Sequence, residues 1–177
     1  MWIFQFIALS LIKLVLCQKP HQSPNIILIL ADDMGWNNIG YHSDNGEIFT
    51  PNLNALAREG IELNRHYAYK ICSPSRSSLQ TGRLPTHVNS QNTGVISHNP
   101  NDPISGYQGI PRNMTGIAQK LKDANYSTHM VGKWDAGMAT PSHTPMGRGY
   151  DSFFGYFQHA NNYWNKKGHI EATGDVD

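Results

Sequence analysis

The chain is poor in cysteine and in net charge, and both shortages narrow what it can be. It has 2 cysteines among 177 residues, and 15% of the residues are charged, with a net charge of +1. So few cysteines exclude a disulfide-rich scaffold, and the balanced charge provides no basic surface for nucleic acid. Low-complexity tracts, heptads and internal repeats are also absent from the sequence. What remains is the composition of a globular chain, long enough for one domain.

The N-terminal segment 1–17 predicts a secretory signal peptide. Its apolar run is too short for a comfortable membrane span, and Val15 and Cys17 are small enough to precede a cleavage point. An uncleaved membrane anchor is the alternative that the sequence leaves open. A bacterial lipoprotein site ending at Cys17 is disfavoured, because Val15-Leu16 lacks the small residues of such a site.

Export has consequences for the mature chain. Cys72 is then its one cysteine, so we expect no disulfide within the chain and no stable membrane span. The location after export would be lysosomal or extracellular. In a eukaryotic secretory pathway Asn113 and Asn125 would be glycosylated, because each opens an Asn-X-Ser/Thr triplet.

Alternating strand and helix patterns predict an α/β domain with a mostly parallel sheet flanked by helices. The continuous apolar run from Asn25 to Ala31 is typical of a central strand buried on both faces. A cap residue followed by proline marks two helix starts, and Gly60 and Gly82 mark the ends of those helices. The expected elements are strands over 25–31, 61–68 and 126–131, helices over 51–60, 74–81 and 115–124, and a long surface loop over 89–113.

Three sets of polar residues fall where open α/β sheets hold their ligands, at the carboxyl ends of strands or at a helix N-terminus. Asp32 and Asp33 follow the first strand, and adjacent carboxylates suit Ca²⁺ or, less well, Mg²⁺. Cys72 and Arg76 lie on one side of the first turn of a helix, where backbone N–H groups favour an anion. Lys133 follows the strand 126–131 and is a second positive group for that anion.

Each set also has a plainer interpretation. The two aspartates would form a turn with a helix-capping carboxylate. Cys72 would be a buried, inert thiol, and Lys133 would be an ordinary surface lysine. The appearance of all three sets in this order favours the functional interpretation.

Four runs of the sequence together have a specific pattern. They are Asn25 to Gly40 with its Ala-Asp-Asp-Met-Gly-Trp, Thr50-Pro51-Asn52-Leu53, Cys72-Ser73-Pro74-Ser75-Arg76 through Thr81-Gly82-Arg83, and Thr128 to Trp134. By these runs the chain resembles the N-terminal part of a sulfatase, close to the arylsulfatase B-like branch. The resemblance extends from about Asn25 to Gly155.

The resemblance implies an alkaline-phosphatase-like fold and the hydrolysis of sulfate esters. Cys72 would be oxidised to formylglycine by the formylglycine-generating enzyme during export, and the hydrated aldehyde would supply the oxygen that attacks sulfur. Asp32 and Asp33 would bind Ca²⁺ together with the modified Cys72. Arg76 would steady the modified side chain, and Lys133 would bind the sulfate of a sulfated small molecule or glycan.

The resemblance also implies that the chain is a fragment. Sulfatases draw further metal and sulfate ligands from the second half of a longer chain. Here an aromatic stretch over 151–157, which needs burial, is followed by an end at Asp177 without a closing element. We therefore expect residues 25–177 to be the N-terminal part of a catalytic domain, incomplete at its C-terminal end.

Two positions depart from the family pattern. Where sulfatases usually read Gly-Lys-Trp-His-Leu-Gly, this chain has Asp135 in place of the histidine that helps the diol and the aldehyde interconvert. A carboxylate can still accept a proton, but it adds negative charge beside a sulfate. Gln80 replaces an apolar residue and predicts altered packing. His129 is expected to be a core or supporting residue, and the sequence assigns no place to His159.

Other classes of protein share parts of this pattern. A cysteine phosphatase needs arginine six positions after the cysteine, where this chain has Ser78. A metal-dependent phosphatase of the same superfamily would have serine or threonine as its nucleophile. The remaining alternative is a secreted, catalytically degenerate sulfatase-like protein that binds sulfated glycans without cleaving them.

Overall fold

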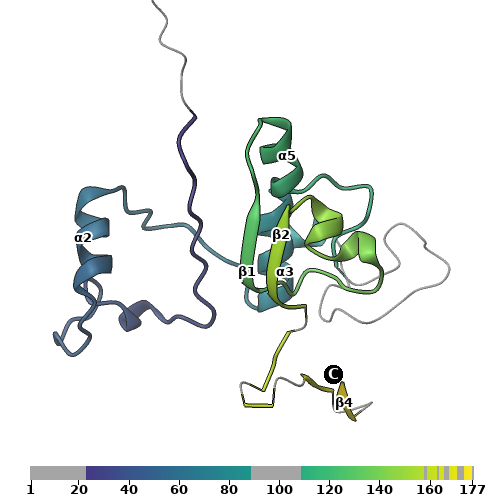
Figure 1. The fold of residues 1–177 in the computed structure, drawn as a ribbon. Coiled ribbons are helices and arrows are strands. Elements are labelled where there is room, and N and C mark those ends of the chain that lie inside the picture. Colours follow the sequence, from purple (N-terminus) through teal and green to yellow (C-terminus); the bar gives the residue numbers. More distant parts are fainter. Residues whose placement is uncertain are drawn as a thin grey trace, which may run out of the picture. The chain divides into compact units, whose positions relative to one another are not determined.

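The structure, a computed structural model, describes residues 23–88, 109–157, 159–162 and 164–165, and the backbone of 168–170 and 174–176. The chain divides into two units, Met1–Leu56 and Ala57–Asp177. Figure 1 colours the elements in chain order. The predicted signal peptide and most of the predicted loop over 89–113 lie outside the described residues.

The second unit contains a short parallel sheet and several helices. Its strands β1 (His129–Lys133) and β2 (Ser152–Tyr156) are parallel, with Met130 opposite Phe153 and Lys133 opposite Tyr156. Its helices are α3 (Cys72–Thr81), α4 (Pro85–Val88) and α5 (Ile117–Asp123), with 3-10 turns η2 (Pro141–His143) and η3 (Met146–Arg148). A further antiparallel pair joins β3 (Gly168–Ile170) to β4 (Gly174–Val176).

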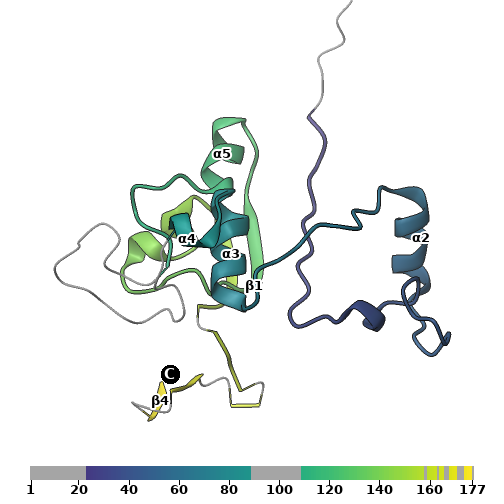
Figure 2. The same cartoon turned by 180° about the vertical axis from the view of Figure 1, so that it is seen from behind.

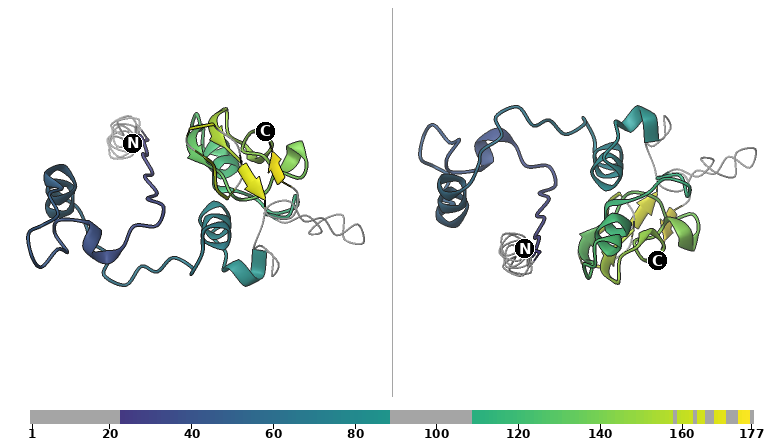
Figure 3. Two further views of the ribbon diagram at one scale, coloured as in Figure 1. Left: turned by 90° about the horizontal axis from the view of Figure 1, so that it is seen from below. Right: turned by 90° about the horizontal axis from the view of Figure 1, so that it is seen from above.

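Helix α3 lies on one side of the β1–β2 sheet. It is seen behind the strands in Figure 1 and in front of them in Figure 2. Its axis runs roughly along the strands, because the views along the strand direction in Figure 3 show it end-on. The N-terminus of α3 therefore lies at one end of this small sheet.

The local sequence explains where α3 begins and ends. Ile71 is the extended N-cap residue, and the helix begins at Cys72, two residues before the predicted start. Gly82 ends it as predicted: its φ of 66° is left-handed, and its N–H donates to the carbonyl of Ser78 at 2.7 Å. Only glycine adopts that backbone conformation at no steric cost, so the stop is encoded locally.

The two faces of the small sheet differ. Met130 and Phe153 are partly buried and pack against the core, whereas Val131 and Phe154 on the other face are 78% and 81% exposed. Alternate residues of a strand point to opposite faces. The face with Met130 and Phe153 is therefore the covered one, and the face with Val131 and Phe154 is bare in the described part of the chain. The core consists of Val88, Ile110, Trp134 and Ala136.

The first unit contains the 3-10 turn η1 (Trp36–Asn38) and the start of helix α2 (Pro51–Glu59), which crosses the boundary between the units and confirms the helix predicted over 51–60. Thr50 organises its start, because Thr50 Oγ1 accepts from the N–H of Gly40 at 2.8 Å and donates to Asn54 Oδ1 at 2.9 Å. The ring of Trp36 stacks on His42 with centroids 3.6 Å apart.

Two predicted strands are wrong. Residues 25–31 and 61–68 have no strand structure, and Ile27 in the first of these runs is 86% exposed. A strand needs a neighbour to satisfy its backbone N–H and C=O groups, and the described residues form no ladder with either run. The third predicted strand exists but is displaced, at 129–133 instead of 126–131, and the helix predicted over 115–124 is α5.

The core position that was one of the two expectations for His129 is wrong. His129 lies in β1, but its side chain is exposed, with Nδ1 2.7 Å from Ser152 Oγ. It is therefore not a core residue. Among the residues that the structure describes, none of the helices has the length and apolar character needed to cross a bilayer.

Candidate active site

Two hydrogen bonds join the start of α3 to the end of β1. The guanidinium of Arg76 donates from Nη1 to the carbonyl oxygen of Lys133 at 2.6 Å, across 57 residues of sequence. The hydroxyl of Ser73 donates to Asp135 Oδ1 at 2.7 Å, across 62 residues. All four residues are buried. The Cys-Ser-Pro-Ser-Arg run and the Gly-Lys-Trp-Asp run therefore form one polar cluster.

The backbone after β1 holds Asp135 in place. The N–H of Trp134 donates to the carbonyl oxygen of Tyr156 at 3.0 Å, and the N–H of Asp135 donates to the carbonyl oxygen of Phe157 at 3.1 Å. Backbone pairing of the two segments therefore continues beyond the strand ends. Asp135 itself has a φ of 49°, in the left-handed region. Aspartate tolerates that region better than most residues. The carboxylate is thus placed at the carboxyl ends of two parallel strands, where α/β sheets commonly hold ligands.

The Asp135 carboxylate is fully buried and has two basic side chains close to it. Its Oδ2 lies 2.9 Å from His159 Nδ1 and 3.7 Å from Lys133 Nζ. The Lys133 side chain is almost fully buried, whereas the imidazole of His159 is 44% exposed. The cluster therefore contains a carboxylate held between a buried ammonium group and an imidazole that reaches solvent.

Cys72 completes this cluster at the first residue of α3. Cys72 Sγ, one carboxylate oxygen of Asp135 and one ring nitrogen of His159 all lie within 4.8 Å of one another. Cys72 is partly buried. The structure brings together all four predicted catalytic residues, Cys72, Arg76, Lys133 and Asp135. His159 is a fifth member of the cluster.

His159 is the residue that sequence reasoning missed. It follows β2 by three positions, after an aromatic stretch that was interpreted only as a segment needing burial. The rule that ligands gather at the carboxyl ends of parallel strands would have identified it once 152–156 was recognised as a strand.

Gln80 packs near the C-terminal end of α3. It is buried, and its Oε1 accepts from the hydroxyl of Tyr150 at 3.0 Å. Burial raises the pKa of the Tyr150 hydroxyl, which keeps the donor protonated for this bond. A polar residue at this position of α3 is therefore satisfied by a partner 70 residues away.

Comparison with known proteins identifies the family of this chain. A family model described as Sulfatase matches residues 24–172, which is most of the chain. The chain belongs to the sulfatase family. The sulfatase pattern found in the sequence is thereby confirmed, and the two runs that carry most of it meet in the second unit.

Named sulfatases and solved structures are similar to this chain over most of its length. It is 40% identical to mouse arylsulfatase J, over 80% of this chain and 22% of that protein. It is 39% identical to human N-acetylgalactosamine-6-sulfatase, over 76% of this chain and 26% of that protein. The crystal structure of Ps i-CgsB matches with a TM-score of 0.67 and 36% identity, over 80% of this chain and 30% of that one. A second crystal structure, of Ps i-CgsB in complex with k-i-k-neocarrahexaose, matches with a TM-score of 0.68.

These matches establish the fold class and its extent. The chain has part of the alkaline-phosphatase-like α/β fold of sulfatases, as the sequence predicted. It spans between 22% and 30% of the length of the relatives quoted above. The small parallel sheet with α3 beside it is the portion that carries the cluster.

The predicted sulfatase metal ligands are divided between the two units. Asp32 and Asp33 belong to the first unit and Cys72 to the second, so a site that joins them remains a prediction. Both aspartates are exposed, and Asp33 has a left-handed φ of 53°. Their chemistry fits calcium, because carboxylate oxygens are the ligands that this ion prefers.

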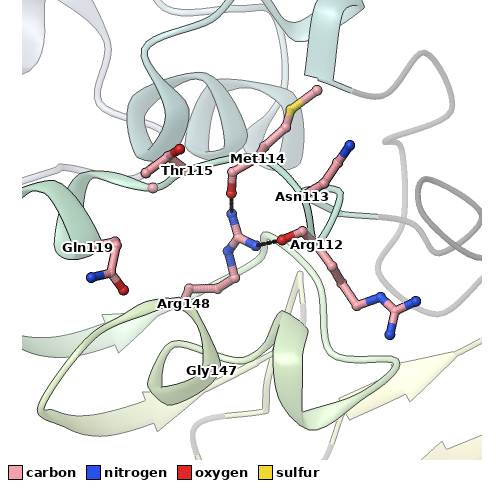
Figure 4. Close-up of a pocket in the computed structure, with 8 residues that line it drawn as sticks. Arg112, Asn113, Met114, Thr115, Gln119, Gly147 and Arg148 are labelled. Atoms are coloured by element: carbon pink, nitrogen blue, oxygen red, sulfur yellow. Dashed lines mark hydrogen bonds between the residues drawn. The ribbon is translucent and has the colours of Figure 1, made fainter.

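A hollow in this sulfatase chain, lined by residues 112–116, 119 and 147–148 and not by Cys72, is shown in Figure 4. Arg148 lies at its centre and donates to the carbonyls of Pro111, Arg112 and Met114. Burial lowers the pKa of its guanidinium. These bonds tie the segment before α5 to η3, so the arginine acts as a structural brace. Asn113, one predicted glycosylation site, lines this hollow and is exposed, and Asn125 is exposed after α5.

Proposed function

We propose that the protein hydrolyses sulfate esters through a formylglycine made from Cys72. The observation that supports this is the joining of the two sulfatase runs by the Ser73–Asp135 and Arg76–Lys133 hydrogen bonds. The two bonds are buried and hold the start of α3 against the end of β1, so the side chains of both runs lie close enough to act on one substrate. Residues 25–177 would be part of the catalytic domain.

The chain's own residues have separate tasks in this proposal. The formylglycine would supply an oxygen nucleophile in place of the thiol. Lys133 would bind the sulfate through its ammonium group, which is held near the cluster by the Asp135 carboxylate. Arg76 would fix the position of β1 relative to α3 through the Lys133 carbonyl, so that the nucleophile and the sulfate-binding group keep their spacing.

Calcium is the cation that we propose for this site. Asp32 and Asp33 would hold it with the modified Cys72, and it would neutralise charge on the sulfate oxygens. Magnesium is less suitable, because it requires a stricter octahedral geometry. The substrate would be a sulfated small molecule or glycan, and the formylglycine-generating enzyme would be a transient partner.

The proposed cellular context follows from the same chemistry. Formylglycine would be made during export, so the proposal requires the signal peptide over 1–17 and a lysosomal or extracellular destination. Mouse arylsulfatase J and human N-acetylgalactosamine-6-sulfatase are both named as sulfatases. Glycosylation at Asn113 and Asn125 would be compatible with their exposure.

A second candidate function is the binding of sulfated glycans without hydrolysis. Asp135 favours it, because it occupies the usual histidine position with a group that repels sulfate. Lys133 and His159 beside its carboxylate weaken this argument, since they offset the negative charge.

The modification of Cys72 is the first test of the proposal. The complete gene product would be expressed in cells that modify a control sulfatase, and the tryptic peptide from Ile71 to Arg76 would be labelled with thiol-reactive and carbonyl-reactive probes. We expect a carbonyl-reactive peptide without sulfur, and sulfate ester hydrolysis that the variant Cys72→Ala lacks. A fully thiol-labelled peptide, with the control sulfatase converted, would favour the glycan-binding alternative.

A further inference from the structure

The cluster at Asp135 contains an imidazole in spite of the missing family histidine. The imidazole comes from His159, which is 24 residues further along the chain and bonds to the residue that occupies the histidine position. One nitrogen of its ring lies within 4.8 Å of both an Asp135 carboxylate oxygen and Cys72 Sγ. The cluster therefore contains an imidazole although position 135 is an aspartate.

We propose that His159 is the proton-transfer residue for the side chain made from Cys72, and that Asp135 is its positioning residue. This inference depends on the proposed sulfatase function, and it adds a catalytic residue from outside the recognised runs. It also assigns a new role to Asp135, which would act through the histidine.

The hydrogen bond to Asp135 selects one tautomer of His159. An ionised carboxylate only accepts hydrogen bonds, so the proton of a neutral imidazole must be on Nδ1, where it faces Asp135 Oδ2 at 2.9 Å. Nε2 then has a lone pair and can accept a proton. A carboxylate that orients a histidine in this way also stabilises the imidazolium that forms after proton transfer.

Asp135 is well held for such a role. Its Oδ1 accepts from Ser73, and its Oδ2 faces both His159 and Lys133. With both oxygens engaged and the side chain fully buried, the carboxylate is poorly placed to leave its partners and approach the reacting group. Its contacts orient the imidazole and exclude water around Oδ1 and Oδ2.

His159 has the access to solvent that proton transfer requires. Its side chain is 44% exposed, whereas the Asp135 side chain is fully buried. In the proposed step, a hydroxyl group of the modified Cys72 side chain loses its proton to Nε2, and the electron pair of the broken O–H bond stays on oxygen. The imidazolium then releases that proton to water, so the histidine is regenerated.

The kinetic test compares His159→Asn with a matched control. Asparagine keeps a side-chain N–H near the position of Nδ1 for Asp135 but has no proton-accepting nitrogen. We expect His159→Asn in the complete gene product to lower kcat by about 10²-fold with little change in KM. The control is His129→Asn, because His129 is also exposed and bonds to one side chain, Ser152, outside the cluster.

A rescue variant distinguishes catalysis from folding. His159→Ala should lose activity, and Asp135→His in the same chain should restore at least about a tenth of the wild-type kcat by returning the imidazole to the family position. Histidine is among the residues that tolerate the left-handed φ of 49° at position 135. Loss in His159→Ala without recovery in the double variant would indicate a structural role and overturn the proposal.

A second readout requires no turnover. When the chain is expressed without the modifying enzyme, Cys72 keeps its thiol, and a nearby proton acceptor favours the reactive thiolate. We expect iodoacetamide to label Cys72 severalfold more slowly in His159→Asn than in the wild type or in His129→Asn. Equal labelling rates in all three proteins would overturn the proposal.

The two readouts separate the inference from the function on which it depends. An active wild type with an unaffected His159→Asn would refute the role of His159 and leave the sulfatase function intact. An inactive wild type, with Cys72 unmodified in cells that modify a control sulfatase, would refute the sulfatase function. In that case His159 would have no reaction to serve, and the inference would fail with it.

Discussion

Two of the runs predicted as strands differ in the structure, because only one of them has a partner among the described residues. The run 126–131 overlaps β1, which pairs with β2 and packs Met130 against the core. The run 25–31 is more apolar, yet Ile27 is 86% exposed and no described residue pairs with the run. The difference shows that an apolar run predicts the capacity for a strand, whereas the strand itself depends on a neighbour that accepts and donates its backbone hydrogen bonds.

The largest effect that we expect from this comparison separates two tryptophans. Trp134 is buried, and its Nε1 donates to the carbonyls of Gly137 at 2.8 Å and His143 at 3.0 Å. Trp134→Ala should lower the free energy of unfolding by about 3–5 kcal/mol through cavity formation. Trp36 is 63% exposed and stacks on His42, so Trp36→Ala should cost less than about 1.5 kcal/mol, the value of one aromatic pair. Urea unfolding followed by far-UV circular dichroism measures both, and equal losses would contradict the comparison.

The next effect concerns the junction of α3 with β1. Arg76→Met removes the charged donor from the Lys133 carbonyl and should destabilise the second unit by about 1.5–3 kcal/mol. Arg83→Met is the matched control from the same run, because Arg83 is exposed and donates to Thr81 at 3.0 Å beside the end of the helix. Its effect should stay within about 0.5 kcal/mol. If urea unfolding gave the same loss for both arginines, the junction would not be the contact that stabilises the cluster.

A smaller effect should appear in acid, at the opposite end of β1. The hydrogen bond from Lys122, at 2.8 Å, is the main cause that lowers the pKa of Asp151 to about 2, with help from the N–H of Thr128. Because the folded-state pKa lies below the ordinary value, this carboxylate stabilises the fold above about pH 4. The stabilisation should be lost as the pH falls from about 4 towards 2.

Thermal unfolding between pH 5 and pH 2 measures this loss. In Lys122→Met the acid-dependent part of the transition should be reduced, because the first cause of the lowered pKa is removed. Lys120→Met is the control, since Lys120 lies 4.0 Å from Asp123 and does not contact Asp151. A pH profile unchanged by Lys122→Met would show that the ion pair contributes nothing to the anchoring of β2.

The local elements of this fold were predictable and the long-range partners were not. Gly82 and Pro51 mark helix boundaries through backbone preferences that need no tertiary contact, so α2 and the end of α3 were predicted correctly. The cluster residues Cys72, Arg76, Lys133 and Asp135 were predicted because their runs have a family pattern. His159 was missed because its role depends on the register of β2 against β1, which a single sequence does not specify.

The smallest effect that we expect is on the bare face of the β1–β2 sheet. Val131 and Phe154 are mostly exposed and lie opposite each other in the strand register. Val131→Thr should change the free energy of unfolding by less than about 0.5 kcal/mol, because little apolar area is removed from contact. Met130→Thr on the covered face is the control, and it should cost more, because Met130 packs against the core. A loss above about 1 kcal/mol for Val131→Thr would mean that this face of the sheet is covered in solution. The exposure of an apolar side chain in the structure would then not show that it lacks a partner, and the interpretation of the run 25–31 would fail as well.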